Sequence, residues 1–132
     1  MGPNDAELVQ VYTRNLGKTI ADVTFDSSAD FEVVVETEAG AALFTTGGAF
    51  TADIVVRDLT ANDNIPYTPG PINDNLGKPP WPAQSNAFVF RVRSADLATR
   101  KGHLCEVYAY LLVGISNFDS SFARSRTFLI QP

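Results

Sequence analysis

The stretch Phe31-Glu32-Val33-Val34-Val35-Glu36-Thr37-Glu38 shows the fold class most clearly. Successive side chains of an extended chain point to opposite faces, so Phe31, Val33 and Val35 share one face and the three glutamates share the other. An apolar face opposite a charged face is typical of an antiparallel strand that packs on one side and meets water on the other. The stretch therefore predicts a half-buried strand of an all-β protein.

The same alternation recurs along the chain, with turn residues such as Gly47-Gly48 between the runs. No window of useful length shows a sustained helical stripe. One helical turn is expected at residues 94–99, with Ser94 as its N-cap. Strands are expected at residues 8–15, 20–25, 31–38, 43–46, 50–59, 87–93, 104–115 and 122–130.

Two of these expected strands have unusual patterns. Residues 104–115 are apolar on both faces, which predicts a central strand that is covered on both sides. In residues 122–130, the alternation of an extended chain would place Arg124 and Arg126 on the same face as the apolar Phe128 and Ile130. The broken alternation predicts a bulge or an exposed edge that is available to a partner.

Residues 60–86 contain six of the eight prolines, which no central strand would tolerate. We expect a long Pro-rich loop there, within one domain that spans residues 1–132, because the flanking halves are too short for two sandwiches. Seven or eight strands separated by turns predict an antiparallel two-sheet β-sandwich of immunoglobulin-like type. The apolar parity of the clearest strands predicts the core residues Val33, Val35, Ile54, Val56, Phe88, Phe90, Val107 and Leu111.

Composition excludes several classes of protein. One cysteine in 132 residues excludes an intrachain disulfide, and a net charge of −5 argues against a nucleic-acid module. The sequence shows neither a signal-peptide pattern nor a run long enough to span a bilayer, so we expect a soluble chain, with the cytoplasm favoured and export not excluded. Charge is uneven: residues 1–66 hold eleven acidic and three basic side chains, a balance of −8, whereas residues 67–132 balance to +3.

The sequence offers little catalytic chemistry. His103 is the only histidine and Cys105 the only cysteine, and this pair is too small for a zinc site. A nucleophile elbow and the phosphate-binding glycine motifs are missing from the sequence. We therefore expect no cofactor and no enzymatic activity; an enzyme that uses two carboxylates is the weakest alternative.

The string Asn62-Asp63-Asn64-Ile65-Pro66-Tyr67 resembles the calcium-binding linker motif of cadherin repeats. The resemblance implies that Asn62, Asp63 and Asn64 are candidate calcium ligands. It covers six residues, and the other ligand strings of that family are missing from the chain. The alternative is that these side chains serve turns, as those of residues 73–75 do.

Trp81 lies among prolines and, with Tyr67, is a candidate platform for a sugar or a peptide. The alternative, which we favour, is that Trp81 folds the loop back over a sheet. These observations favour a non-catalytic protein-interaction or assembly module, with Arg124 and Arg126 at its interface to a partner or a second copy. A carbohydrate- or calcium-binding sandwich is the alternative function.

Overall fold

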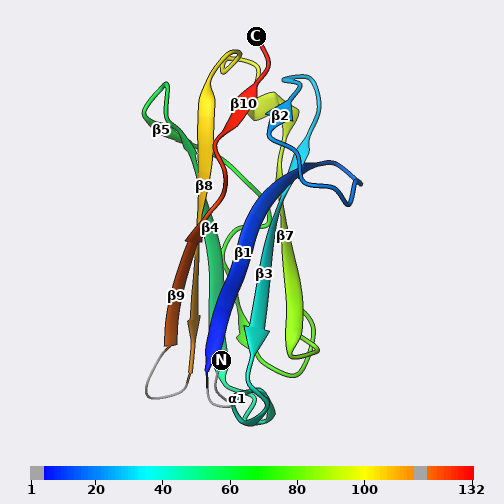
Figure 1. The fold of residues 1–132 in the computed structure, drawn as a ribbon, viewed down its shortest axis with the longest axis vertical. Helices are drawn as coiled ribbons and strands as arrows, with labels where there is room; N and C mark the ends of the chain where they lie inside the picture. The colour runs from blue at the N-terminus through cyan, green and yellow to red at the C-terminus, as the bar shows by residue number, and fades with distance from the viewer. Residues whose placement is uncertain (1–4, 115–118) are drawn as a thin grey trace.

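The chain forms two β-sheets packed face to face, as a computed structural model that describes residues 5–114 and 119–132 shows (Figure 1). The small sheet has the order β1 (Ala6–Asn15), β3 (Phe31–Ala39) and β7 (Ser85–Val92). The large sheet has the order β2 (Thr24–Phe25), β10 (Phe128–Ile130), β8 (Leu104–Val113), β4 (Ala49–Asp58) and β5 (Asp63–Ile65). Two more strands join it: β6 (Ile72–Asn75) pairs with β4, and β9 (Asp119–Arg124) pairs with β8. The expected immunoglobulin-like sandwich is confirmed.

The core lies between the two sheets. All eight residues predicted for it are at most 3% exposed, because each occupies the inward parity of its strand. At one end of the sandwich, Phe25 stacks on Phe31 with ring centroids 4.4 Å apart, and Phe128 meets both rings edge-on. Aromatic burial of this kind supplies much of the energy of a core.

Residues 60–86 are more ordered than the expected loop. They contribute β5 and β6, which pair with β4 at Val56–Asp58 and at Ala49–Ala52. Trp81 is 0% exposed, and its ring meets Phe50 and Phe88 edge-on at centroid distances of 5.1 and 5.6 Å. Its indole Nε1 donates to the carbonyl of Gln84 at 3.3 Å. The segment is therefore folded back over the core, as the favoured interpretation of Trp81 required.

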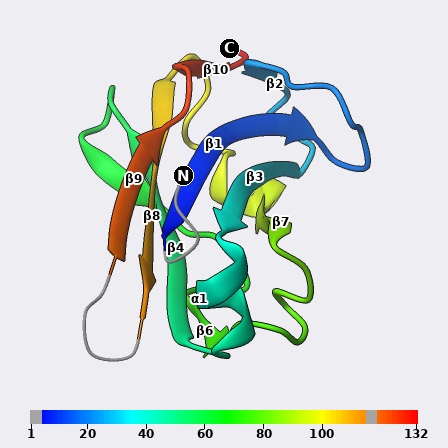
Figure 2. The ribbon, with the colours of Figure 1, turned by 60° about the horizontal axis from the view of Figure 1, so that its bottom comes forward.

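Three local predictions are wrong. Residues 43–46 are not a strand, because the helix α1 (Ala41–Thr45) occupies that place between β3 and β4 (Figure 2). Only β2 and a single bridge from Ala21 to Arg14 form within residues 20–25. The helical turn is the 3-10 helix η1 (Ser94–Asp96), whose N-cap is Arg93 and not Ser94.

The last predicted strand is two strands. β9 pairs with residues 108–113 of β8, and β10 pairs with residues 104–105 of the same strand. Ser125 lies at the break: its N–H donates to the carbonyl of Val107 at 2.8 Å, and its Oγ accepts from the N–H of Val107 at 2.9 Å. The break resets the alternation, so Arg124 is exposed on one side of it while Phe128 and Ile130 are buried on the other.

β8 is a central strand, as predicted, since it lies between β4 on one side and β9 and β10 on the other. The prediction that both of its faces are covered is wrong. Its inner face is buried, but Tyr108 on the outer face is 41% exposed. Among the described residues, no second layer covers this outer face.

Candidate functional site

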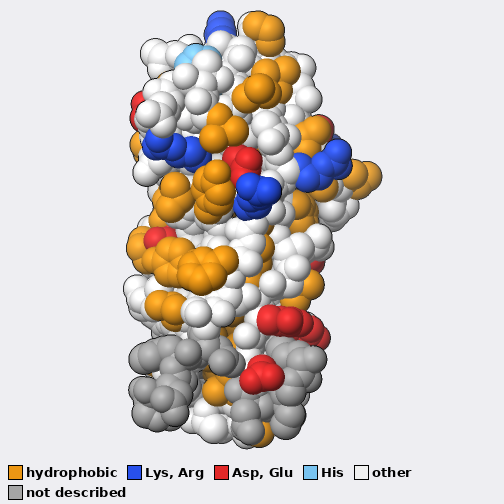
Figure 3. Space-filling view, turned by 60° about the vertical axis from the view of Figure 1, so that its left-hand side comes forward, with side chains coloured by type: hydrophobic (Ala, Val, Ile, Leu, Met, Phe, Trp, Pro, Cys, Tyr) orange, Lys and Arg blue, Asp and Glu red, His pale blue; other side chains and the backbone are white. Residues whose placement is uncertain are grey.

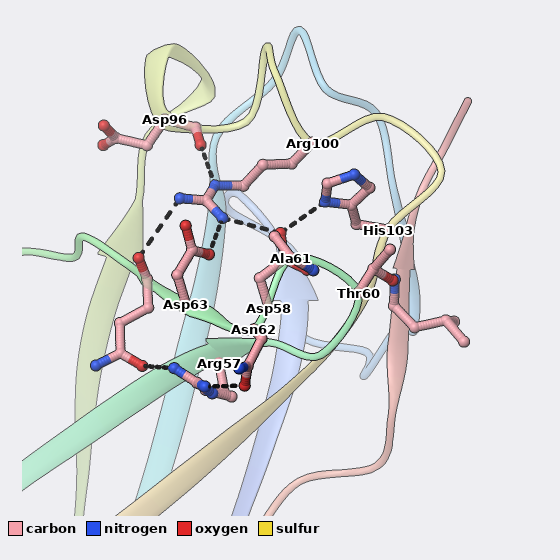
Figure 4. Close-up of polar contacts among 11 residues, drawn as sticks. Arg57, Asp58, Thr60, Ala61, Asn62, Asp63, Asp96, Arg100 and His103 are labelled. Carbon is pink, nitrogen blue, oxygen red and sulfur yellow. Dashed lines mark hydrogen bonds and ion pairs between the residues drawn. The ribbon is translucent and has the colours of Figure 1, made fainter.

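A polar cluster closes the end of the large sheet where β4 stops (Figure 4). The carboxylate of Asp58 is 0% exposed and accepts three hydrogen bonds: from the N–H of Ala61 at 2.9 Å, from Arg100 Nη1 at 2.8 Å and from His103 Nδ1 at 2.7 Å. We call Asp58, Asp63, Arg100 and His103 the Asp58 cluster. Arg100 Nη1 also donates to Asp63 Oδ1 at 2.5 Å. The cluster thus ties the segment after η1 to the turn after β4.

Opposing effects set the charge state of Asp58. Burial by itself would raise the pKa of this carboxyl, but the hydrogen bonds from Ala61, His103 and Arg100 outweigh burial and lower the pKa from 3.8 to about 2. Asp58 is therefore ionised at neutral pH. A buried carboxylate whose oxygens are bonded in this way holds its neighbours in place.

Of the three candidate calcium ligands, Asn62 lies in the turn after β4, and Asp63 and Asn64 begin β5; Asp63 is itself part of the Asp58 cluster. The side-chain oxygens of Asn62 and Asn64 accept hydrogen bonds from Arg57, with Arg57 Nη1 3.0 Å from Asn64 Oδ1. Asp63 is bonded to Arg100. Within residues 5–114 and 119–132, His, Cys, Asp and Glu side chains form no group of three or more that could hold a metal ion. Arginines are bonded to the oxygens that calcium would need.

The most unusual surface is the outer face of the large sheet (Figure 3). Hydrophobic side chains gather across its middle, with exposed fractions of 74% for Phe122, 41% for Tyr108 and 36% for Val55. The register places Phe122 opposite Tyr110 and Val55 opposite Tyr108. We call Val55, Tyr108, Tyr110, Leu112 and Phe122 the aromatic face.

A carboxylate with two phenol partners lies within this surface. Asp53 Oδ2 accepts from the Tyr110 hydroxyl at 3.2 Å, and Asp53 Oδ1 accepts from Tyr67. Burial and the neighbouring Asp53 raise the pKa of both tyrosines above the ordinary value. The Tyr67 ring also packs edge-on against Phe90, at 5.7 Å between centroids. These contacts fix the rings that flank the centre of the aromatic face.

Arg124 stands at the rim of the aromatic face. Its side chain is 73% exposed, and its Nε lies 3.6 Å from Oε1 of Glu106. That oxygen is buried and has no hydrogen-bond partner among the described residues. Arg124 is therefore close enough to neutralise Glu106 while its guanidinium stays open to solvent.

Two hollows of opposite charge lie on either side of β1. The basic groove, of about 590 Å³, runs between β1 and the chain around β9, and Arg124 and Arg126 line it. The acidic hollow, of about 450 Å³, lies over β3 and β7, where Glu36 and Glu38 line it. Val9, which is 53% exposed, lines both. No acidic side chain is among the described residues that line the basic groove, and none that line the acidic hollow is basic.

Trp81 and Tyr67, which the sequence analysis paired as a candidate platform, do not form one surface in the structure. Trp81 is buried, so it offers no exposed platform; Tyr67 has different neighbours and borders the aromatic face. Cys105 is buried, and burial raises the pKa of its thiol to about 12, which keeps the thiol protonated at neutral pH.

Sequence reasoning missed Phe122 and Tyr108 as surface residues. The signal that could have found Phe122 is its shared parity with Ser120 and Arg124, two polar neighbours. For Tyr108 the signal is weaker, because the charged Glu106 precedes it on the same face of the strand while Tyr110 and Leu112 follow it.

No model of a known protein family matches the chain, and no curated protein matches it. Among solved structures, the C-terminal domain of Wzt is similar over 100% of this chain and 75% of its own, with a TM-score of 0.57 and 7% identity. The periplasmic chaperone SfaE (TM-score 0.45, 6% identity, 92% of this chain and 57% of that one) also matches. AggA, the major subunit of aggregative adherence fimbriae type I from Escherichia coli, matches as well, with a TM-score of 0.46 and 7% identity over 93% of this chain and 97% of its own.

The likeness to the Wzt domain supports the sandwich fold. None of the three likenesses supports the expected cytoplasmic location. The helices of the described residues are all too short to cross a membrane.

Proposed function

We propose that this sandwich is a non-catalytic protein-interaction module that binds its partner with the aromatic face. The observation that carries the proposal is the 74% exposure of Phe122 beside the half-exposed Tyr108. Contiguous exposed aromatic side chains on a folded protein mark binding surfaces. Tyrosine, phenylalanine and arginine are enriched at the centres of protein interfaces.

The face also indicates the chemistry of the partner. Arg124 is the cation at the rim of the face, directly opposite Tyr108 in the register, whereas the Asp53 carboxylate within the face is bonded to Tyr67 and Tyr110. The Arg124 side chain is 73% exposed and its Nε lies 3.6 Å from one carboxylate oxygen, so the guanidinium retains donors for a second carboxylate. The partner we propose is a protein surface with an apolar centre and an acidic side chain at its rim.

The experiment places a photo-crosslinking amino acid at position 122 and, as a matched control, at Val89. Val89 is 40% exposed on the outer face of the small sheet, so it is an apolar strand residue on the opposite side of the molecule. In the cells that make the protein, we expect a discrete cross-linked protein from position 122 and none from position 89.

The cross-linked protein is then purified and its binding measured by calorimetry. Phe122→Ser should raise the dissociation constant about tenfold or more, as truncation of an interface anchor does. Val89→Ser should leave the dissociation constant unchanged. Absence of a protein adduct at position 122, or equal adducts at both positions, would contradict the proposal.

Trp81 gives no support to carbohydrate binding, since its ring is buried. The alternative of an enzyme that uses two carboxylates gains no specific observation. We therefore propose one function.

A further inference from the structure

We infer that a second surface, centred on Val9 and bordering the aromatic face at Arg124, joins two copies of this chain. The surface consists of the basic groove on one side of β1 and the acidic hollow on the other. β1 is the edge strand of the small sheet and runs between β3 and β9 (Figure 1). The two hollows therefore face solvent side by side.

Three of the four charged residues of these hollows form no ion pair within the described part of the molecule; the fourth, Arg124, lies 3.6 Å from Glu106. Among the described residues, no ion pair involves Glu36, Glu38 or Arg126. Glu36 accepts a hydrogen bond from Gln10, and Glu38 accepts one from Ser85 at 3.4 Å; both donors are neutral. Glu32, by contrast, forms an ion pair with Arg14 of the same chain at 3.0 Å.

A twofold axis supplies what each hollow lacks. Because Val9 borders both hollows, an axis that passes beside Val9 exchanges the two sides of β1. The basic groove of one copy then meets the acidic hollow of the other, and the same contact occurs a second time by symmetry. Two exposed Val9 side chains meet near the axis and add apolar area to the contact.

The local shape of β1 favours this arrangement. The register between β1 and β3 shifts between Leu8 and Gln10, so Val9 is the extra residue of a bulge. Bulges of edge strands re-aim a side chain and prevent indiscriminate pairing of sheet edges. The contact we infer is therefore made by side chains, without a continuous sheet across the two copies.

The experiment measures the sedimentation of the whole chain at about 50 µM, a concentration at which a weak dimer is populated. It compares salt of about 0.1 M, where the Debye length is about 10 Å, with about 1 M, where it is about 3 Å. We expect a dimer at low salt that weakens at high salt. A monomer under both conditions would overturn the inference.

Two single variants reverse one charge each: Arg126→Glu in the basic groove and Glu36→Lys in the acidic hollow. Each variant alone repels its own copy twice and should weaken the dimer at least tenfold. An equal mixture of the two should restore a dimer, because Glu at 126 then faces Lys at 36 and the second contact keeps its native Arg126 and Glu36. Arg93→Glu, on an exposed arginine outside both hollows, is the control and should dimerise like the wild type.

A dimer that survives both single variants would overturn the inference, as would a mixture that fails to associate. Far-ultraviolet circular dichroism and a melting curve confirm that each variant is folded. Phe122→Ser should leave the dimer intact. If Phe122→Ser breaks the dimer and the charge variants do not, the Val9 surface is wrong while the proposed function of the aromatic face stands.

Discussion

The Asp58 cluster and the aromatic face belong to the same sheet, yet the cluster buries a charged group and the face exposes apolar groups. In the cluster a fully buried charge has a partner on each side, all from this chain. On the face, large apolar side chains lie in solvent, and no residue among those described covers them. Burying a charge without partners is very unfavourable, so the cluster serves stability. Exposing an aromatic ring contributes nothing to folding, so the face is free to serve binding.

The largest expected effect breaks the cluster. Asp58→Asn removes the charge that holds Arg100 and His103, so the free energy of unfolding should fall by about 2 to 3 kcal/mol. Urea unfolding followed by tryptophan fluorescence measures it. Asp63→Asn is the matched control, since Asp63 also bonds Arg100 but is 55% exposed; it should cost about 1 kcal/mol or less. Equal losses would show that burial does not distinguish the two carboxylates.

Acid titration sharpens the role of Asp58. Its folded pKa of about 2 lies below the ordinary 3.8, so its contribution is complete above about pH 4 and is lost as the pH falls through 2. That difference in pKa corresponds to about 2 kcal/mol. The stability gap between the wild type and Asp58→Asn should therefore shrink by about this amount from about pH 6 to about pH 2. The other carboxylates titrate in both proteins and cancel; a constant gap would contradict the assignment.

A small effect is expected on the aromatic face. Phe122→Ser should change the free energy of unfolding by no more than about 0.5 kcal/mol, because the ring is 74% exposed. Phe128→Ser, four residues past the end of the strand that carries Phe122, replaces a ring that is 1% exposed and should cost about 3 to 5 kcal/mol in the same urea experiment. A large loss in Phe122→Ser would mean that the face is part of the core.

Calcium should have no effect. About 1 mM calcium is expected to leave the melting temperature unchanged, since Arg57 and Arg100 are bonded to the oxygens of residues 62–64. A melting temperature that rises with calcium in the wild type and not in Asp63→Ala would reverse this expectation.

Much of the sandwich could be predicted from alternation, because inward and outward parity is a local property of each strand. β3, β4, β7 and β8 were located to within two residues at each end. α1 was missed although Ala41-Ala42-Leu43 contains good helix formers after Gly40. β5 and β6 were missed because pairing with β4, and not their own sequence, makes them strands.

The sites were less predictable than the fold. Asp58 meets Arg100 and His103 across more than 40 residues of chain, and no sequence spacing announces that contact. The role of Arg124 and Arg126 at an interface stays a prediction, and the position of Phe122 between the polar Ser120 and Arg124 on the same face was not used. That the chain is one domain, and not an enzyme, stays a prediction.

Ser125 divides residues 120–130 into two parts that differ in how far their side chains can vary. Its hydroxyl takes the place of a backbone group opposite Val107. As a result, the even-numbered residues before Ser125 face solvent, whereas the even-numbered Phe128 and Ile130 after it are buried. The outward-facing Ser120, Phe122 and Arg124 can therefore change with the demands of a partner while the packing of the core is untouched. Ala123 packs against the core, and the Ser121 hydroxyl accepts a hydrogen bond from the N–H of Leu8, so these two residues are less free to change. Residues 128–130 are fixed between β2 and β8 and cannot vary in this way. One hydroxyl thus separates the part of the segment that can diversify from the part that must be conserved.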